Sequence, residues 1–169
     1  MDREECILLV HDLKTGSAKD PYKAIHTLGH EGYLDAKPVI ETFLHHSDPS
    51  LRYIALNVLT IHWNCKDHAK TCEAFIHGDS DLDCRRIGVA GLGALFEGTR
   101  DSRILGVLLK LFKDEKEDGS IRDSAYSQIL YVLGKPATDQ PTAARRLDYK
   151  SDVNWTWIRE AQDLVGGGA

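Results

Sequence analysis

The sequence predicts an all-α fold, a short right-handed α-solenoid of stacked helical hairpins. Three observations predict it: one motif recurs along the chain, apolar residues follow helical spacing around each copy, and no stretch alternates apolar and polar residues as a half-buried strand does. Self-similarity at periods of about 20–50 residues is typical of solenoids, whose units bury one another's apolar faces.

The motif is most regular in the stretches "SDPSLRYIALNVL", "DSDLDCRRIGVAGL" and "EDGSIRDSAYSQIL". In each copy an aspartate precedes an arginine by four residues, a small residue follows the arginine three positions later, and an aliphatic residue follows it seven positions later. The pairs are Asp48 with Arg52, Asp81 with Arg85, and Asp118 with Arg122. An earlier, degenerate copy has Pro21 in place of the arginine, and Arg159 stands where a fifth copy would begin.

Each copy is expected to begin a helix. Asp48 can accept hydrogen bonds from the free amides of a first turn, and Pro49 suits the first helical position, where no amide partner is lost. Gly88 and Gly91 lie inside the next of these helices, where each costs roughly 1 kcal/mol relative to alanine. We therefore expect a neighbouring backbone to pack very close to them.

Second helices are expected between the copies, in "AKPVIETFL", "DHAKTCEAFI" and "DSRILGVLLKLF". The third is apolar on most of its circumference and should be the most buried. Asp67 and Asp101 are expected to cap the second and third of them. A first helix around Glu4 to Lys14 and a last one around Asn154 to Val165 would close the two ends.

The motif resembles HEAT repeats, and its aspartate-to-arginine form looks like the HEAT-like repeats of the phycobilin lyase group. The resemblance covers about Ser17 to Gly134. It implies a structural ladder between adjacent units, which would link the repeated acids and bases: Asp48, Asp81 and Asp118 with Arg52, Arg85 and Arg122.

We expect a single HEAT-like domain over residues 1–169. It would consist of an N-terminal capping helix (1–16), about four repeats (17–134), a connector (135–151) and a C-terminal capping helix (152–165). The connector has little apolar content and breaks the repeat, so it is also a candidate for contact with a partner.

Composition and charge exclude several classes of protein. The formal charge of −5 and the pI near 5.9 disfavour binding to nucleic acid by phosphate neutralisation. The opening "MDREEC" lacks the basic start and apolar stretch of a secretory signal, and no apolar run approaches the roughly 20 residues of a membrane span. The four cysteines are too few and too scattered for a disulfide framework. We expect a soluble, cytoplasmic protein with reduced thiols.

The densest set of metal-capable residues is "HWNCKDHAKTC", which contains His62, Cys65, His68 and Cys72. Structural zinc sites usually pair ligands two to four residues apart at two separate points, whereas this segment crosses a predicted turn. We therefore expect no metal there. Five histidines are expected on exposed helix faces or ends: His26, His45, His46, His68 and His77.

Two other segments are similar to those of HEAT-like enzymes. His30 and Glu31 resemble the histidine–glutamate pairs with which a hydroxylase family binds two irons, but the chain has one such pair where several are needed. "NWTWIRE" is similar to the tryptophan, acid and arginine residues of HEAT-like DNA glycosylases, but lies at the end of the chain, where a hydrophobic cap is the simpler interpretation. Its residues are Trp155, Trp157, Arg159 and Glu160.

The function that these observations favour is a non-catalytic protein-binding module or adaptor, such as an inhibitor or immunity protein of a basic partner. The partner would bind the concave face, which the second helices line. The expected contact residues are Lys37, Glu41, His45, Lys70, Glu73, His77, Arg103, Lys110 and Lys113. No catalytic residue, metal or cofactor is expected. The alternative is a HEAT-like enzyme or enzyme subunit, either tetrapyrrole lyase- or chaperone-like or DNA glycosylase-like.

Overall fold

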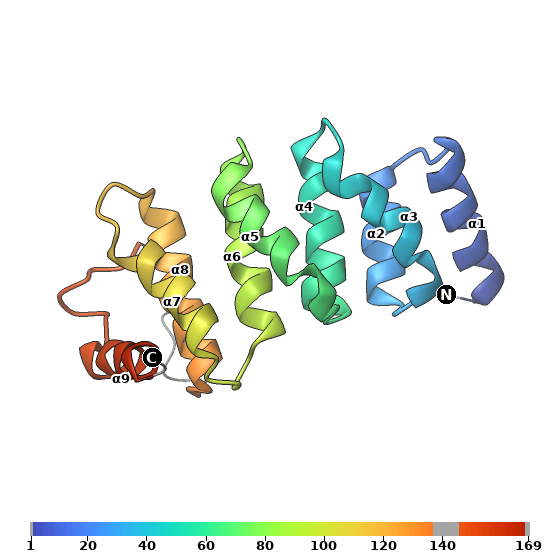
Figure 1. Ribbon diagram of the computed structural model, residues 1–169. Coiled ribbons are helices and arrows are strands. Elements are labelled where there is room, and N and C mark those ends of the chain that lie inside the picture. Colours follow the sequence, from blue (N-terminus) through green and yellow to red (C-terminus); the bar gives the residue numbers. More distant parts are fainter. Residues whose placement is uncertain (1, 137–145, 168–169) are drawn as a thin grey trace. The chain divides into compact units, whose positions relative to one another are not determined.

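The computed structural model describes residues 2–136 and 146–167, and these are all-helical, without a strand among them (Figure 1). The prediction of an all-α fold is confirmed. The chain forms two compact units, residues 1–91 and 92–169, and each is described by itself. The single domain expected from the sequence stays a prediction. No helix in the described ranges is long and apolar enough to cross a membrane.

The first unit contains five α-helices and the beginning of a sixth. They are α1 (Arg3–Thr15), α2 (Pro21–His30), α3 (Lys37–Thr42), α4 (Pro49–Asn57), α5 (Ala69–Gly78) and α6 (Leu82–Leu95), the last of which runs into the second unit. Short helical turns join them: η1 (Leu34–Ala36), η2 (Phe43–His45), the π-helix η3 (Val58–His62) and η4 (Lys66–His68). The expected first helix is confirmed as α1.

The aspartates of the motif begin their own helices. Asp48 accepts a hydrogen bond from the Ser50 amide at 2.8 Å, with Pro49 in the first turn of α4, as predicted. Asp81 accepts one from the Cys84 amide at 2.9 Å in α6. Asp118 does the same for the Ser120 amide at 2.7 Å in α8 (Gly119–Leu133). The acid of each copy therefore satisfies amides that a helix start leaves without partners.

The arginines of the motif bind the carbonyl groups just before them in the chain. Arg85 Nε donates to the Ile76 oxygen at 2.8 Å, and Arg122 Nε donates to the Phe112 oxygen at 3.0 Å. Carbonyl groups at a helix end have no partner within the helix, so these bonds satisfy the ends of α5 and α7 (Ser102–Lys113).

Arg52 binds carbonyl groups before it in the chain and also a carboxylate. Its Nη1 donates to the His46 and Ser47 oxygens at 2.9 and 3.1 Å. Its Nε and Nη2 bind both oxygens of Asp79 at 2.8 and 2.7 Å, and both side chains are largely buried. The carboxylate that pairs with Arg52 is thus Asp79, two positions before the Asp81 of the motif.

The glycines of α6 lie against close neighbours. A Cβ atom on Gly88 would lie 2.8 Å from the Cys72 carbonyl oxygen, and one on Gly91 would lie 2.6 Å from Thr60 Oγ1. Distances of this size leave no room for a side chain. The close backbone approach expected from the sequence is confirmed at Gly88.

The second unit is built around α7, which packs on α8 and on α9 (Trp155–Gly166). Asp101 caps α7 by accepting from the Ile104 amide at 3.0 Å, as predicted. The prediction that α7 is the most buried of the second helices is also confirmed, because it has six buried residues: Ile104, Leu105, Leu108, Leu109, Leu111 and Phe112. The expected last helix is confirmed as α9.

Residues 137–145 of the expected connector lie outside the described residues. The part from residue 146 onward is fastened to α8 through Asp123, which binds Arg146 Nε at 2.5 Å and the Tyr149 hydroxyl at 2.8 Å. The guanidinium of Arg122 lies 4.5 Å from the centre of the Tyr149 ring. This part of the connector is therefore ordered by side-chain contacts.

Two local predictions were wrong. Asp67 does not cap α5, because it lies within η4, and α5 begins at Ala69 without a side-chain cap. His68 is not on an exposed face, since only 7% of it is accessible to solvent. Both residues are instead drawn into contacts with α3.

Candidate functional site

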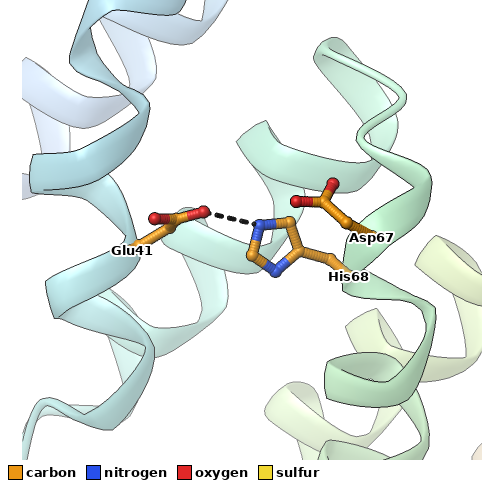
Figure 2. A group of neighbouring side chains, drawn as sticks. All are labelled: Glu41, Asp67 and His68. Atoms are coloured by element: carbon orange, nitrogen blue, oxygen red, sulfur yellow. Dashed lines mark hydrogen bonds and ion pairs between the residues drawn. The ribbon is translucent and has the colours of Figure 1, made fainter.

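The clearest gathering of polar side chains in the first unit joins α3 to η4 (Figure 2). Glu41 extends from α3, and Asp67 and His68 extend from η4 toward it. Lys37, one helical turn before Glu41, completes the set. These four residues, Lys37, Glu41, Asp67 and His68, are called the Lys37 cluster below.

His68 is the buried member of the Lys37 cluster. Its Nε2 lies 3.1 Å from Glu41 Oε1, and its Nδ1 lies 3.4 Å from the Thr71 hydroxyl. A carboxylate can only accept, so Nε2 carries the proton and Nδ1 can accept from Thr71. The imidazole therefore has a partner at each nitrogen and holds α3 against η4 and the start of α5.

Lys37 supplies the positive charge of the cluster. Its Nζ lies 2.6 Å from Asp67 Oδ2 and 3.8 Å from Glu41 Oε1. The hydrogen bond from Lys37 lowers the pKa of Asp67, and the same bond raises the pKa of Lys37. The ammonium group thus stabilises the ionised form of the carboxylate beside it.

Glu41, Asp67 and His68 are the one set of metal-capable side chains that gathers within 4.8 Å among the residues described by the structure. Two carboxylates and one imidazole would suit a divalent metal ion in donor type. However, the ammonium of Lys37 already lies where a cation would bind both carboxylates. The donor set fits a metal only if Lys37 moves away, so the cluster as it stands works as a polar clasp between helices.

The cysteines and histidines of the "HWNCKDHAKTC" segment are held apart. Cys72 is fully buried in α5, and burial raises the pKa of its thiol to about 12. His68 is bound by Glu41, whereas His62 packs edge-on against His26 at 6.1 Å between ring centroids. Cys65 is half-buried, and burial also raises its pKa. All four cysteines are free thiols.

The nine residues expected to contact a partner differ in accessibility. Lys37, Glu41 and Glu73 are half-buried. The exposed members are His45, Lys70, His77, Arg103, Lys110 and Lys113. Two of the half-buried residues, Lys37 and Glu41, belong to the Lys37 cluster, so their polar groups are already engaged within the first unit.

A pocket in the second unit lies beside α9. Its lining residues are Arg100, Thr156, Arg159, Glu160, Asp163 and Leu164. Glu160 is bound there by Lys135 at 2.6 Å and by Arg100 at 2.7 Å, and these cations lower its pKa. A carboxylate held ionised in this way is a poor general acid. Both oxygens of Glu160 are thus engaged within the second unit, and the glycosylase-like alternative stays a prediction.

The tryptophans that begin α9 make contacts within the second unit. Trp155 lies 6.0 Å from Phe112 between ring centroids, and its Nε1 donates to the Tyr149 oxygen at 3.2 Å. The Trp157 ring lies 5.6 Å from Lys135 Nζ. Trp155 is nevertheless 46% exposed, so it covers Phe112 only in part.

The sequence interpretation missed the pairing of Lys37 and Glu41 with Asp67 and His68. The four-residue spacing of Lys37 and Glu41 is a signal for an ion pair along a helix. No signal in the neighbouring sequence indicated that η4 would lie against Lys37 and Glu41.

No protein-family model matches this chain, and no curated protein matches it either. The resemblance to HEAT-like repeats therefore stays a prediction from the motif.

Proposed function

We propose that the protein is a non-catalytic protein-binding module of the HEAT-like solenoid type. The repeated use of an aspartate as a helix cap and of an arginine as a clamp on the preceding carbonyl groups supports a repeat architecture. In a solenoid the second helices line one broad surface, and this surface binds the partner. The second helices here are α3 and α5 in the first unit and α7 in the second.

The observation that carries the proposal is the charge of the exposed side chains on these helices. Of the residues expected to contact a partner, those exposed are three lysines, one arginine and two histidines, whereas both glutamates are half-buried. The net charge of −5 predicts a basic partner, but the surface of the second helices has the opposite sign. We therefore propose a partner that offers acidic side chains, in place of the basic partner of an inhibitor or immunity protein.

The helix α7 supplies the strongest part of this surface. It contains no aspartate or glutamate, and its exposed face carries Arg103, Lys110 and Lys113. In the described part of the chain, no carboxylate lies within ion-pair distance of Lys110 or Lys113. Both ammonium groups are thus available to a partner, and rim charges of this kind steer association and set its salt dependence.

The test is capture of partners from the native lysate by the tagged full chain, at low and at high salt. A double charge reversal, K110E/K113E, is compared with K14E/K19E, which makes the same change of charge at exposed lysines outside the second helices and the connector. Captured proteins are identified and quantified by mass spectrometry, and an absorption spectrum of the purified chain reports a bound chromophore.

We expect one protein in a fixed ratio to the bait, captured by the wild type and by K14E/K19E. K110E/K113E should capture at least about tenfold less, because it replaces attraction by repulsion at two sites, and high salt should weaken capture by the wild type. Equal capture by both variants would place the partner elsewhere. A bound chromophore or nucleic acid would favour the enzyme alternative.

A further inference from the structure

Three exposed histidines gather where α2 meets η3 in the first unit. His26 and His30 are four residues apart on α2, so they lie on one face of that helix. His62 is the last residue of η3. All three are exposed to solvent. They are called the histidine group below, and none of them belongs to the Lys37 cluster.

The backbone beside the histidine group is held closely in place. Gly29 and Val58 are in such close contact that a Cβ atom on Gly29 would lie 2.4 Å from Val58 Cγ2. The Trp63 indole nitrogen donates to the Gly29 oxygen at 3.1 Å. Gly29 directly precedes His30, and Trp63 directly follows His62. The contacts of Gly29 and Trp63 therefore fix the backbone next to His30 and His62.

The π-helix sets the direction in which His62 extends. The Trp63 amide donates to the Val58 oxygen at 3.0 Å, five residues back instead of the four of an α-helix. The additional residue in this turn rotates the following side chains by about 100° relative to a regular helix. Such π-turns are rare and occur frequently at functional sites.

The rings of His26 and His62 lie about 1 Å farther apart than a shared metal ion requires. The centroids of the His26 and His62 rings are 6.1 Å apart, with an interplanar angle of 79°. Two imidazoles on one tetrahedral Zn²⁺ have centroids about 5 Å apart, because each nitrogen lies about 2.0 Å from the metal. Binding of a shared ion therefore requires the rings to move together by about 1 Å, and exposed side chains change rotamer on a timescale of picoseconds to nanoseconds.

The nitrogen atoms of the histidine group are available as ligands. Within the described residues, no ring of the group makes a hydrogen bond or an ion pair. A neutral imidazole binds a metal through either of its ring nitrogens.

We propose that His26, His30 and His62 form a binding site for one divalent transition-metal ion of the class that prefers imidazole, such as Zn²⁺. Three nitrogen ligands leave further positions for water or for a ligand from another molecule. Carboxylate-preferring ions such as Mg²⁺ and Ca²⁺ are not expected to bind. The bound ion links α2 to η3 and thereby stabilises their contact.

The test is titration of the full chain, without a polyhistidine tag, with Zn²⁺ by isothermal titration calorimetry. Visible absorption of added Co²⁺ reports the coordination. The variants are H26Q, H30Q and H62Q, each of which removes one proposed ligand. The matched controls are H45Q and H77Q, which alter exposed histidines elsewhere in the first unit, and H68Q, which alters the Lys37 cluster.

The wild type and the controls are expected to bind one Zn²⁺ per chain and to show the same rise in unfolding temperature when Zn²⁺ is added. Each ligand variant should lower the affinity by at least about tenfold, the loss that even an outer-shell substitution can cause. The proposal is overturned if the wild type binds no Zn²⁺, if H68Q loses binding while H62Q retains it, or if no variant changes the affinity.

Discussion

The Lys37 cluster and the histidine group are two groups of polar side chains in the same unit. They differ in whether their polar atoms already have partners within the protein. In the Lys37 cluster each side chain already has a partner, and Lys37 lies 2.6 Å from Asp67 as a cation of the protein's own. In the histidine group the rings are exposed, and no hydrogen bond or ion pair to them is found among the residues that the structure describes. A dense set of carboxylates can therefore be a structural contact whose polar atoms are already paired. An external ligand is expected instead where donor atoms have no partner within the protein.

The two gatherings also differ in how they are built. Glu41 and His68 meet because long polar side chains reach across from α3 to η4. The elements that carry the histidine group meet where the Gly29 backbone lies against the Val58 side chain. A substitution at Gly29 and a substitution of the charged residues should therefore affect the two gatherings separately.

The largest effect is expected for Gly29→Ala. The added Cβ atom would lie 2.4 Å from Val58 Cγ2, so α2 must move away from α4 and η3. Overpacking of this kind costs roughly 1–3 kcal/mol of the free energy of unfolding. Urea denaturation measures this loss, and zinc titration of the same variant should show weaker binding by the histidine group, because its two elements are pushed apart.

Gly78→Ala is the matched control for Gly29→Ala. No atom lies within 4 Å of a Cβ at Gly78, and its backbone has no positive φ, so the variant should be as stable as the wild type or slightly more so. A Gly29→Ala protein with unchanged stability would show that the contact with Val58 relaxes without cost. The histidine group would then not depend on it.

Interactions between residues close in sequence could be predicted, such as the helix start at Asp48. The contacts of the Lys37 cluster could not. The cap formed by Asp48 and Pro49 could be read from the sequence because a cap needs only neighbouring residues, and the crowding at Gly88 could be inferred from the cost of glycine in a helix. The burial of His68 depends on Glu41, 27 residues earlier in the chain. No local signal carries that information.

The histidine group shows the same division between local and distant information. The four-residue spacing of His26 and His30 was visible in the sequence and could have suggested a metal-capable pair on a helix. His62 joins them only because α4 continues into a π-helix. The apolar spacing of "ALNVLT" does not distinguish this from a regular helix, so the third member could not be predicted.

A smaller effect is expected for Lys37→Met, which keeps the apolar stem and removes the charge. The pair with Asp67 is partly exposed, so its loss should lower the free energy of unfolding by less than about 1 kcal/mol. The same variant should gain a weak second Zn²⁺ site, because Glu41, Asp67 and His68 would no longer have a cation of their own. Isothermal titration of Lys37→Met measures both the number of sites and their affinities.

Lys14→Met, at an exposed position in the last turn of α1, is the control for the loss of one positive charge. It should bind a single Zn²⁺, as the wild type is expected to do. The double variant K37M/H68Q should lose the second site and keep the first. A second site that survives in this double variant would mean that Lys37 does not compete with metals at the Lys37 cluster.

The smallest effect is expected in the dependence of stability on pH, where the two gatherings should act in different ranges. The pKa of His62 is lowered in the folded protein, so the unfolded chain binds the proton more tightly. The free energy of unfolding should therefore fall as the pH falls from about 6.5, the unfolded value, through the folded pKa. The pKa of Asp67 is lowered as well, so its contribution to the free energy of unfolding is present above about pH 3.9 and is lost as the pH falls through its folded pKa.

Urea midpoints measured across this range should show the upper step reduced in H62Q and the lower step reduced in D67N. If both variants altered the same step, the two gatherings would be coupled, and the separation drawn between them would be wrong.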